Sequence, residues 1–338
     1  MIKEAINELS LKNNLTPDLM RKVMEEIMTG KAKTAEIVSF LDALNKKGET
    51  VEEITAAVSV MRNHVTKIRT DKDVVLDTCG TGGDKKGTFN VSTLAAFVAS
   101  GAGITVAKHG NRSVSSSCGS ADILEALGVN INMPKKNIEE CLNDIGIAFL
   151  YAPNLHPAMK YAMPARKQMG VRTIFNILGP LTNPAGATHQ LLGVYEIRWV
   201  KILATVLGNL GTTHALVVHS QDGLDEVSTT ARTYVSETYQ GSLKDYEINP
   251  QDFGFPKVQL EDLRGKEVCD NTRIVLDVLK GEAGPKRDIV LLNAAAAIYA
   301  ADKAKSLEEG IKMASESIDS GKALEKLEAL KEYSQKNK

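Results

Sequence analysis

The sequence predicts an α/β protein in which a small all-helical domain precedes a large α/β domain with a central, mostly parallel sheet flanked by helices. The first 70 residues repeat their apolar side chains only with the period of a helix. From Asp73 onward, short β-branched runs alternate with helical stretches, which is typical of a parallel sheet. We therefore expect a helical domain over residues 1–70 and an α/β domain over residues 71–338.

The N-terminal helices carry clear start signals. Thr16 precedes Pro17, which places a cap residue before a proline at the first helical position. Residues 34–47 repeat apolar side chains with helical period. Thr50 and Glu53 then form the sequence of a capping box. These signals predict at least three helices and no strand in this domain.

The α/β domain is predicted from the order of its short runs. Five runs read as strands, at residues 74–76, 104–107, 147–150, 191–195 and 215–218. Helical stretches between them lie at residues 92–100, 120–127 and 198–210. Residues 231–262 predict a more irregular β segment, and the chain becomes helical again from Thr272.

A segment rich in proline and glycine, residues 153–187, also carries His156, Arg166 and Arg172. This composition does not suit a flexible linker. We expect a crossing between the two domains that brings side chains into a cleft, with about 155–187 contributing to the helical domain.

Charge and composition exclude several classes of protein. The net charge of −1 gives no bulk attraction to nucleic acid or to an anionic membrane. No apolar run reaches the roughly 18 residues of a spanning helix. The four cysteines, Cys79, Cys118, Cys141 and Cys269, are scattered and form no metal-like pair. We expect a cytoplasmic protein that binds neither nucleic acid nor membrane.

A glycine-rich loop, DTCGTGGD at residues 77–84, joins the first predicted strand to a helix. Glycines let backbone N–H groups approach an anion, and the start of a helix adds unpaired donors. The loop fits neither the dinucleotide spacing nor Walker A, in which Thr88 would have to be a lysine. A tight turn is the alternative, but the polar residues at the helix mouth exceed what a cap requires and favour phosphate binding. They are Asp84, Thr88, Asn90, Ser92 and Thr93.

Two further clusters follow predicted strands. Residues 108–117 supply two cations, one histidine and four serines after the second strand, which suits a polyanion. Asp225 and Glu226 follow the fifth strand and suit Mg²⁺, which prefers oxygen ligands. A solvated loop and an acidic turn are the structural alternatives. Because ligands bind at the carboxyl ends of parallel strands, the three clusters together predict a site for a magnesium–polyphosphate substrate.

The same motifs resemble those of the anthranilate phosphoribosyltransferases of tryptophan biosynthesis, and the resemblance extends over essentially the whole chain. It rests on residues 80–84 (GTGGD), 90–93 (NVST), 108–112 (KHGNR) and 176–184 (NILGPLTNP), with Arg166 and the pair Asp225-Glu226.

This resemblance implies a helical domain plus an α/β domain, and a homodimer joined through the helical domains. It implies a glycosyltransferase that moves the phosphoribosyl group of 5-phosphoribosyl 1-diphosphate (PRPP) to the amine of anthranilate. The products are N-(5-phosphoribosyl)anthranilate and diphosphate, in the second step from chorismate to tryptophan. It also implies two Mg²⁺ ions in each active site.

The resemblance also implies the residues of the site. PRPP would contact Gly80, Gly83, Asp84, Thr88, Asn90, Val91, Ser92, Thr93, Lys108, His109, Gly110, Asn111, Arg112, Ser113, Val114, Ser115, Ser116 and Ser120. Anthranilate would contact Gly80, Asn111, Arg166, His109 and His156. Ser92 would bind one Mg²⁺, and Asp225 with Glu226 the other. Lys108 would act electrostatically, and no residue would serve as an essential general base.

Two rival functions share this fold. A pyrimidine nucleoside phosphorylase would use the same phosphate loop, but we expect it to lack the Asp225-Glu226 pair and an arginine such as Arg166. A nucleic-acid-binding relative would carry a basic groove and degraded motifs, whereas the motifs here are intact.

Overall fold

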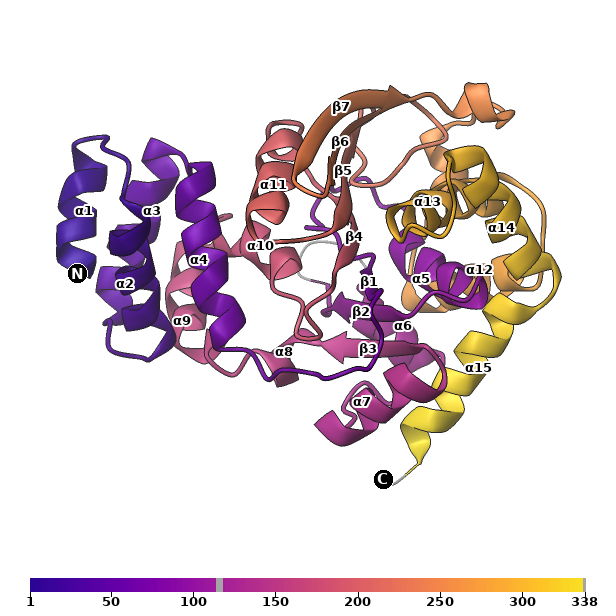
Figure 1. The fold of residues 1–338 in the computed structure, drawn as a ribbon, viewed down its shortest axis with the longest axis horizontal. Helices are drawn as coiled ribbons and strands as arrows, with labels where there is room; N and C mark the ends of the chain where they lie inside the picture. The colour runs from indigo at the N-terminus through magenta and orange to yellow at the C-terminus, as the bar shows by residue number, and fades with distance from the viewer. Residues whose placement is uncertain (114–117, 337–338) are drawn as a thin grey trace.

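The computed structural model describes residues 1–113 and 118–336, which form a helical lobe and an α/β lobe (Figure 1). The helical lobe contains four N-terminal helices and two helices from later in the chain. They are α1 (Ile2–Ser10), α2 (Pro17–Met28), α3 (Thr34–Lys47), α4 (Val51–Asn63), α9 (Met159–Met169) and α10 (Phe175–Leu178). The later α9 packs against α2 and α3, so the segment between the lobes returns to the N-terminal helices.

The caps of the N-terminal helices form as the sequence predicts. Thr16 Oγ1 accepts a hydrogen bond from the N–H of Leu19, and Thr50 with Glu53 forms a capping box. Glu53 is also fully buried, where it pairs with Lys47 at 2.6 Å and accepts from the N–H of Leu15. One capping carboxylate therefore ties three segments of the lobe together.

The α/β lobe contains one seven-stranded sheet in the order β3-β2-β1-β4-β5-β6-β7. The first five strands run parallel, and β6 and β7 are antiparallel, which confirms the mostly parallel sheet. The strands are β1 (Leu76–Asp77), β2 (Val106–Gly110), β3 (Ile147–Tyr151), β4 (His189–Gly193), β5 (His214–Ser220), β6 (Thr233–Tyr239) and β7 (Ser242–Ile248).

The segment predicted to be irregular begins with a regular hairpin. β6 and β7 pair in register from Thr233 to Tyr239, and a two-residue turn, Gln240 and Gly241, joins them. Both turn residues have positive φ, +48° and +82°, which suits the twist of a hairpin. Gln-Gly is a weaker turn signal than Asn-Gly, so the sequence did not reveal the hairpin. Short 3₁₀ turns follow at η2 (Pro250–Phe253) and η3 (Leu260–Leu263).

Helices cover both faces of the sheet (Figure 1). α11 (Arg198–Asn209) lies against β5 and β6 on one face and also packs on α4, so the helical lobe shares its apolar core with this side of the sheet. The opposite side is covered by α5 (Val91–Gly101), α6 (Ser120–Ala126), α7 (Lys135–Asp144), α12 (Val268–Leu279), α13 (Pro285–Ala300), α14 (Leu307–Asp319) and α15 (Lys322–Gln335). The short α8 (Ala152–Leu155) and η1 (Gly179–Leu181) lie between the lobes in sequence. Within the described residues, none of the helices combines the length and apolar character needed to cross a membrane.

A partly buried ionic network lies at the amino ends of β4 and β5. His214 Nδ1 lies 2.7 Å from Asp302 Oδ1, and its Nε2 lies 2.9 Å from Glu237 Oε1. The hydroxyl of Tyr299 donates to the same Glu237 oxygen, and His189 lies 3.3 Å from Asp302. Burial by itself lowers the pKa of His214, but its hydrogen bonds to the two carboxylates outweigh burial and raise it.

This network predicts a pH-dependent part of the stability. Because the folded state raises the pKa of His214 above 6.5, its contribution is complete below pH 6.5 and is lost as the pH rises through the raised value. We expect His214→Gln to remove on the order of 1–2 kcal/mol at pH 6, the size of hydrogen bonds to charged groups, and less at pH 8.5. Urea denaturation of both proteins across this range measures the difference, and a difference that does not change with pH would contradict the prediction.

Candidate active site

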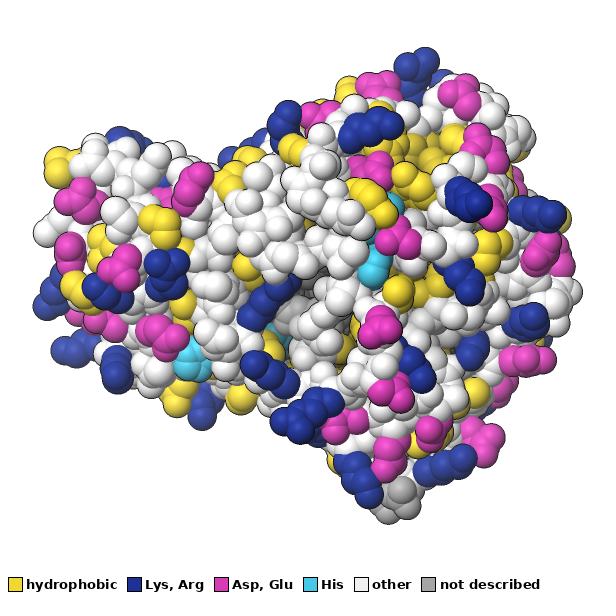
Figure 2. Space-filling view, viewed as in Figure 1, with side chains coloured by type: hydrophobic (Ala, Val, Ile, Leu, Met, Phe, Trp, Pro, Cys, Tyr) yellow, Lys and Arg dark blue, Asp and Glu magenta, His cyan; other side chains and the backbone are white. Residues whose placement is uncertain are grey.

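The three predicted clusters meet at the carboxyl edge of the sheet, and Figure 2 shows a hollow between the two lobes with lysine and arginine side chains beside it. Lys108, at the end of β2, donates from Nζ to Ser92 Oγ at 3.3 Å and to the carbonyl of Thr78 at 3.1 Å. Glu226, after β5, accepts a hydrogen bond from the backbone N–H of Ser92. Residues from three strand ends therefore contact one another at the first turn of α5.

The glycine loop depends on backbone conformations that favour glycine. Gly82, Gly83 and Gly87 have φ of +64°, +83° and +71°, and Lys85 between them has φ of +60°. Residues with a Cβ adopt this left-handed conformation only at a cost in free energy, whereas glycine adopts it freely. The glycines therefore permit the shape of the loop as well as close approach to a ligand.

Gly80 and Gly193 allow the loop, β4 and the acidic turn to come together. A Cβ on Gly80 would lie 3.2 Å from the carbonyl oxygen of Gly193 and 3.5 Å from Asp225 Oδ2. The N–H of Thr81 donates to the same Gly193 carbonyl at 2.9 Å. On the other side, a Cβ on Gly193 would overlap the carbonyl oxygen of Asp225.

Replacing Gly193 with alanine is expected to displace the turn that carries Asp225. The obstacle is backbone, which cannot rotate away, so we expect a loss of about 1–3 kcal/mol in the free energy of unfolding. Urea denaturation measures this loss. Gly179→Ala is the matched stability control, because a Cβ there has no neighbour within 4 Å among the described residues. Equal stability of the two variants would contradict the prediction.

Polar residues cap the start of α5. Asn90 is the N-cap residue, and its Oδ1 accepts from the N–H of Thr93 at 3.0 Å. Ser92 Oγ donates to the same oxygen at 3.4 Å. Val91 begins the helix and is buried, while Thr88 forms a β-bridge with Arg264 just before it. Glu226 accepts from the N–H of Ser92, and Asn271 Oδ1 accepts from the N–H of Asn90 at 3.3 Å, so side chains already engage most donors of the first turn.

Three carboxyl groups gather beside the loop. Burial, and then the charge of Asp84, raises the pKa of Asp225 to about 7. Burial, and then the charge of Asp225, raises the pKa of Glu226 well above its ordinary value, against which the charge of Lys108 acts. Burial raises the pKa of Asp84 as well, and its Oδ2 is buried with no hydrogen-bond partner among the described residues. An oxygen cluster in which three carboxyl groups outnumber the cations beside them fits a hard cation such as Mg²⁺.

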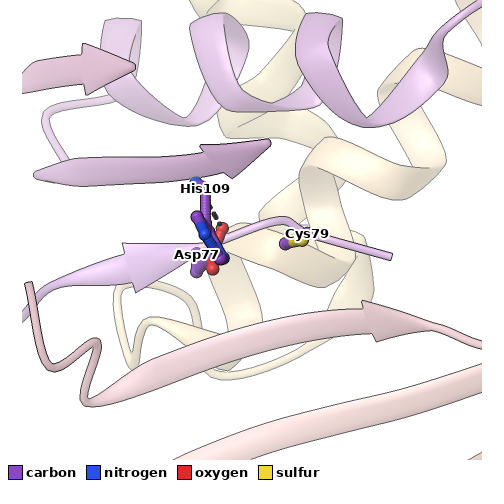
Figure 3. Close-up of side chains that lie close together, drawn as sticks. All are labelled: Asp77, Cys79 and His109. Carbon is purple, nitrogen blue, oxygen red and sulfur yellow. Dashed lines mark hydrogen bonds between the residues drawn. The ribbon is translucent and has the colours of Figure 1, made fainter. Parts of the chain in front are cut away.

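A second cluster, Asp77, Cys79 and His109, lies at the ends of β1 and β2 (Figure 3), with one potential ligand atom from each residue within 4.8 Å of the others. Both oxygens of Asp77 are already engaged, by the N–H of His109 at 3.2 Å and by Asn183 Nδ2 at 2.7 Å. Burial raises the pKa of the Cys79 thiol to about 12, so it stays protonated. We assign this cluster to the floor of the site and not to a metal.

His109 and His156 form a buried pair. Their Nε2 atoms lie 3.0 Å apart, and their rings are 4.9 Å apart between centroids. Burial lowers the pKa of His156 to about 4, and burial followed by the charge of His156 lowers that of His109. Both rings are therefore neutral at pH 7, and one donates to the other.

Arg166 lies near the end of α9 and is partly buried. Its guanidinium lies 5.6 Å from the ring centroid of Phe175 and 3.8 Å from Met163 Sδ. It forms no salt bridge within residues 1–113 and 118–336, and burial lowers its pKa. A partly buried cation without an acidic partner is suited to an anionic ligand.

Other predicted residues are engaged elsewhere. Arg112 pairs with Asp122 and Glu125 of α6, each at 2.9 Å. Asp122 also accepts from the N–H of Ser113. The backbone carbonyl of the exposed Asn111 accepts from Ser120 Oγ at 3.4 Å, beneath Gly110. Val114, Ser115 and Ser116 lie outside the described residues.

Sequence reasoning placed Arg172 among the side chains expected in a cleft and Asn183 in a family motif, but it gave no individual role to either residue or to Gly193. Arg172 donates to the carbonyl of Gly83 in the glycine loop. Asn183 Nδ2 binds Asp77 and also the carbonyl of Ala107 at 2.8 Å. In the sequence, these residues are distinguished only by their position within residues 153–187 and 191–195. Position alone does not indicate which residue of a segment contacts the site.

Comparison with known proteins identifies the family. Residues 72–324 match the α/β domain of a glycosyl transferase family, and residues 3–65 match the helical bundle domain of such a family. An anthranilate phosphoribosyltransferase from Anaeromyxobacter sp. (strain K) is 53% identical over 330 residues, which cover 98% of each chain. This chain belongs to the anthranilate phosphoribosyltransferase family.

Solved anthranilate phosphoribosyltransferases share its fold. The enzyme from Thermus thermophilus matches with a TM-score of 0.92 and 40% identity, covering 98% of this chain and 99% of that chain. The enzyme from Saccharomyces cerevisiae in complex with PRPP and Mg matches with a TM-score of 0.88 and 29% identity, covering 98% and 97%. The same yeast enzyme has been solved in complex with 4-fluoroanthranilate. The predicted fold of a helical part and an α/β part is thus confirmed.

Proposed function

We propose that this chain transfers the phosphoribosyl group of PRPP to the amine of anthranilate and releases diphosphate. The observation that carries this proposal is the contact of Lys108, Ser92 and Glu226 at the first turn of α5. A cation, the start of a helix and an acidic pair at one point suit a magnesium–diphosphate group. The yeast member of the family was solved with PRPP and Mg, which supports the same ligands here.

The diphosphate would lie between the glycine loop, the start of α5 and Lys108. The loop offers backbone N–H groups, and the start of α5 adds the positive end of the helix dipole. Lys108 is only 4% exposed, so its charge acts in a region with little water to screen it. We place the other PRPP contacts on the remaining residues of the three clusters.

Mg²⁺ would bind to Ser92 on one side and to Asp225 with Glu226 on the other, two ions in all. The buried, unpartnered Oδ2 of Asp84 and the raised pKa values of Asp225 and Glu226 support this assignment. When bound, the metal would neutralise negative charge that develops on the leaving diphosphate.

Anthranilate would bind across from the diphosphate, with its carboxylate on Arg166. The planar guanidinium can form two parallel hydrogen bonds to a carboxylate. Gly80, Asn111 and the neutral pair His109–His156 would form the rest of this site, and neutral imidazoles would not compete with Arg166 for the carboxylate.

The reaction needs no essential general base on this chain. The aromatic amine of anthranilate is uncharged at pH 7, so its nitrogen can attack C1 of the ribose as diphosphate leaves, and the product nitrogen then loses a proton to water. Lys108 stabilises charge on the departing diphosphate, and Arg166 orients the nucleophile. Positioning and electrostatics therefore supply the rate enhancement.

We further propose a homodimer joined through the helical lobe and a location in the cytoplasm. At this lobe, the region of α1 exposes Met1 and Leu11, at 46% and 71%. Light scattering tests the dimer, and the mass of a single chain would reject it.

We also keep the domain division at residue 70, with about 155–187 joining the first domain. Packing of α9 on α2 and α3 supports that division.

The decisive experiment follows the fluorescence of anthranilate on addition of PRPP and Mg²⁺. We expect fluorescence to fall only when both are present. Release of base from thymidine or uridine with phosphate, without loss of anthranilate, would instead identify a phosphorylase.

A further inference from the structure

Arg172 joins three parts of the molecule. Its guanidinium lies 3.7 Å from the ring centroid of Tyr195, which follows β4, and its Nη1 lies 3.8 Å from Glu196 Oε1. Its Nη2 donates to the carbonyl of Gly83 in the glycine loop. Its own carbonyl accepts from Asn45 Nδ2, on α3 of the helical lobe, at 2.7 Å.

The contact with Gly83 restrains the orientation of a peptide in the glycine-rich part of the loop. Gly82 and Gly83 have no side chains to restrict the backbone, and no regular secondary structure spans them. In a trans peptide the carbonyl and the following N–H point in opposite directions. Holding the Gly83 carbonyl on Arg172 therefore turns the N–H of Asp84 away from Arg172.

We propose that Arg172 is a positioning residue that orients the 83–84 peptide so that the Asp84 N–H is presented to the diphosphate of PRPP. This inference rests on the proposed function, because it assumes that PRPP binds at the loop. It gives a role in substrate binding to a side chain from the segment between the lobes, 89 residues away in sequence.

The geometry requires arginine at this position. A guanidinium can lie flat on an aromatic ring and still donate hydrogen bonds from its edge, whereas an ammonium is a point charge without a plane. Tyr195 is itself tied to the loop, because its N–H donates to Thr81 Oγ1 at 3.1 Å. Tyr195, Arg172 and the glycine loop therefore support one another: the loop holds Tyr195, the ring of Tyr195 orients Arg172, and Arg172 binds the loop.

The variant Arg172→Lys tests the proposal, because it keeps the charge and loses the plane. We expect the KM for PRPP to rise about tenfold or more, the effect of losing one charge-assisted hydrogen bond, with the KM for anthranilate within about twofold. If Arg172 only linked the two lobes, its substitution would lower the stability of the protein but would not raise the KM for PRPP more than the KM for anthranilate. Equal changes in both KM values, or an unchanged KM for PRPP, would overturn the proposal.

Arg198→Lys is the matched control. Arg198 also lies over an aromatic ring, 4.5 Å from Trp199, and pairs with the same Glu196, but it has no hydrogen bond to the glycine loop among the described residues. We expect both of its KM values to stay within about twofold of the original, the range of a surface substitution.

Hydrogen exchange of residues 80–88 provides a readout that is independent of turnover. We expect PRPP with Mg²⁺ to protect these amides in the original protein and to protect them less in Arg172→Lys. Protection without consumption of anthranilate would reject the proposed function and leave the role of Arg172 standing, whereas equal protection in both proteins would overturn that role. If Arg172→Lys does not fold, Tyr195→Leu removes the aromatic support and is expected to show the same defect, with Tyr195→Phe behaving as the original.

Discussion

Replacing the acidic pair with amides, Asp225→Asn with Glu226→Gln, is expected to abolish magnesium-dependent turnover while the chain stays folded. Both carboxyl groups lie beside Ser92, Lys108 and the glycine loop, where an oxygen-coordinated cation would meet the diphosphate. Amides keep the shape of the side chains but lose the charge that attracts the ion. We expect kcat/KM to fall by at least about a thousandfold, the upper range for loss of one preorganised electrostatic contact. The rate of anthranilate consumption at saturating Mg²⁺ measures this.

The same variant is expected to be at least as stable as the original protein without Mg²⁺. Burial and mutual repulsion raise the pKa values of Asp225 and Glu226, so their charges oppose folding. Added Mg²⁺ with PRPP should raise the melting temperature of the original protein and not that of the variant.

Asp222→Asn is the control from the same turn. Despite its burial, hydrogen bonds from Thr230 and Ser228 lower the pKa of Asp222, so this carboxylate supports the fold. We expect its loss to reduce stability. Turnover at the original rate in the double variant would show that Asp225 and Glu226 are ordinary turn residues.

Replacing Arg166 with alanine is expected to raise the KM for anthranilate about a hundredfold, because truncation of a buried charged hydrogen-bond partner costs about 2–5 kcal/mol. The KM for PRPP should stay within about threefold. Among the described residues the guanidinium of Arg166 has no acidic partner, and it lies near the ring of Phe175 and the thioether of Met163, so it is suited to bind the carboxylate of anthranilate under the proposed function. Steady-state kinetics with each substrate varied in turn give both values.

Two further variants sharpen this result. Arg166→Lys should bind anthranilate with intermediate affinity, because lysine keeps the charge and cannot form the bidentate pair. Lys167→Ala removes the adjacent exposed cation of α9 and should leave both KM values unchanged. Equal increases in the two KM values of Arg166→Ala would rule out a specific contact with anthranilate.

The sequence predicted the features that depend on short-range pattern and on a topological rule. Thr50 and Glu53 cap a helix as their spacing indicates. Ser92, Lys108 and Glu226 follow three different predicted strands, and a parallel sheet brings strand ends of this kind to one edge. Such signals are local, so no knowledge of packing is needed to find them.

Contacts that depend on how distant segments pack together could not be predicted from the sequence. Asn183 binds Asp77, which lies 106 residues away in sequence, and the residues around either one do not indicate this contact. The need for glycine at position 193 appears only when the turn at Asp225 lies against β4. Arg112 lies in a motif expected to face PRPP, yet its guanidinium pairs with two carboxylates of α6, which a side chain with four rotatable bonds can reach.

The three clustered carboxylates beside the phosphate loop also bear on selectivity. Under the proposed function, a polyanion that arrives without a cation would meet the negative charge that Asp84, Asp225 and Glu226 carry when ionised, and this charge would oppose its binding to the glycine loop and Lys108. A polyanion that arrives as its magnesium complex brings the charge that cancels this repulsion. Under the proposed function, the acidic residues would therefore disfavour metal-free nucleotides and free phosphates, so that repulsion as well as attraction would act in the choice of substrate.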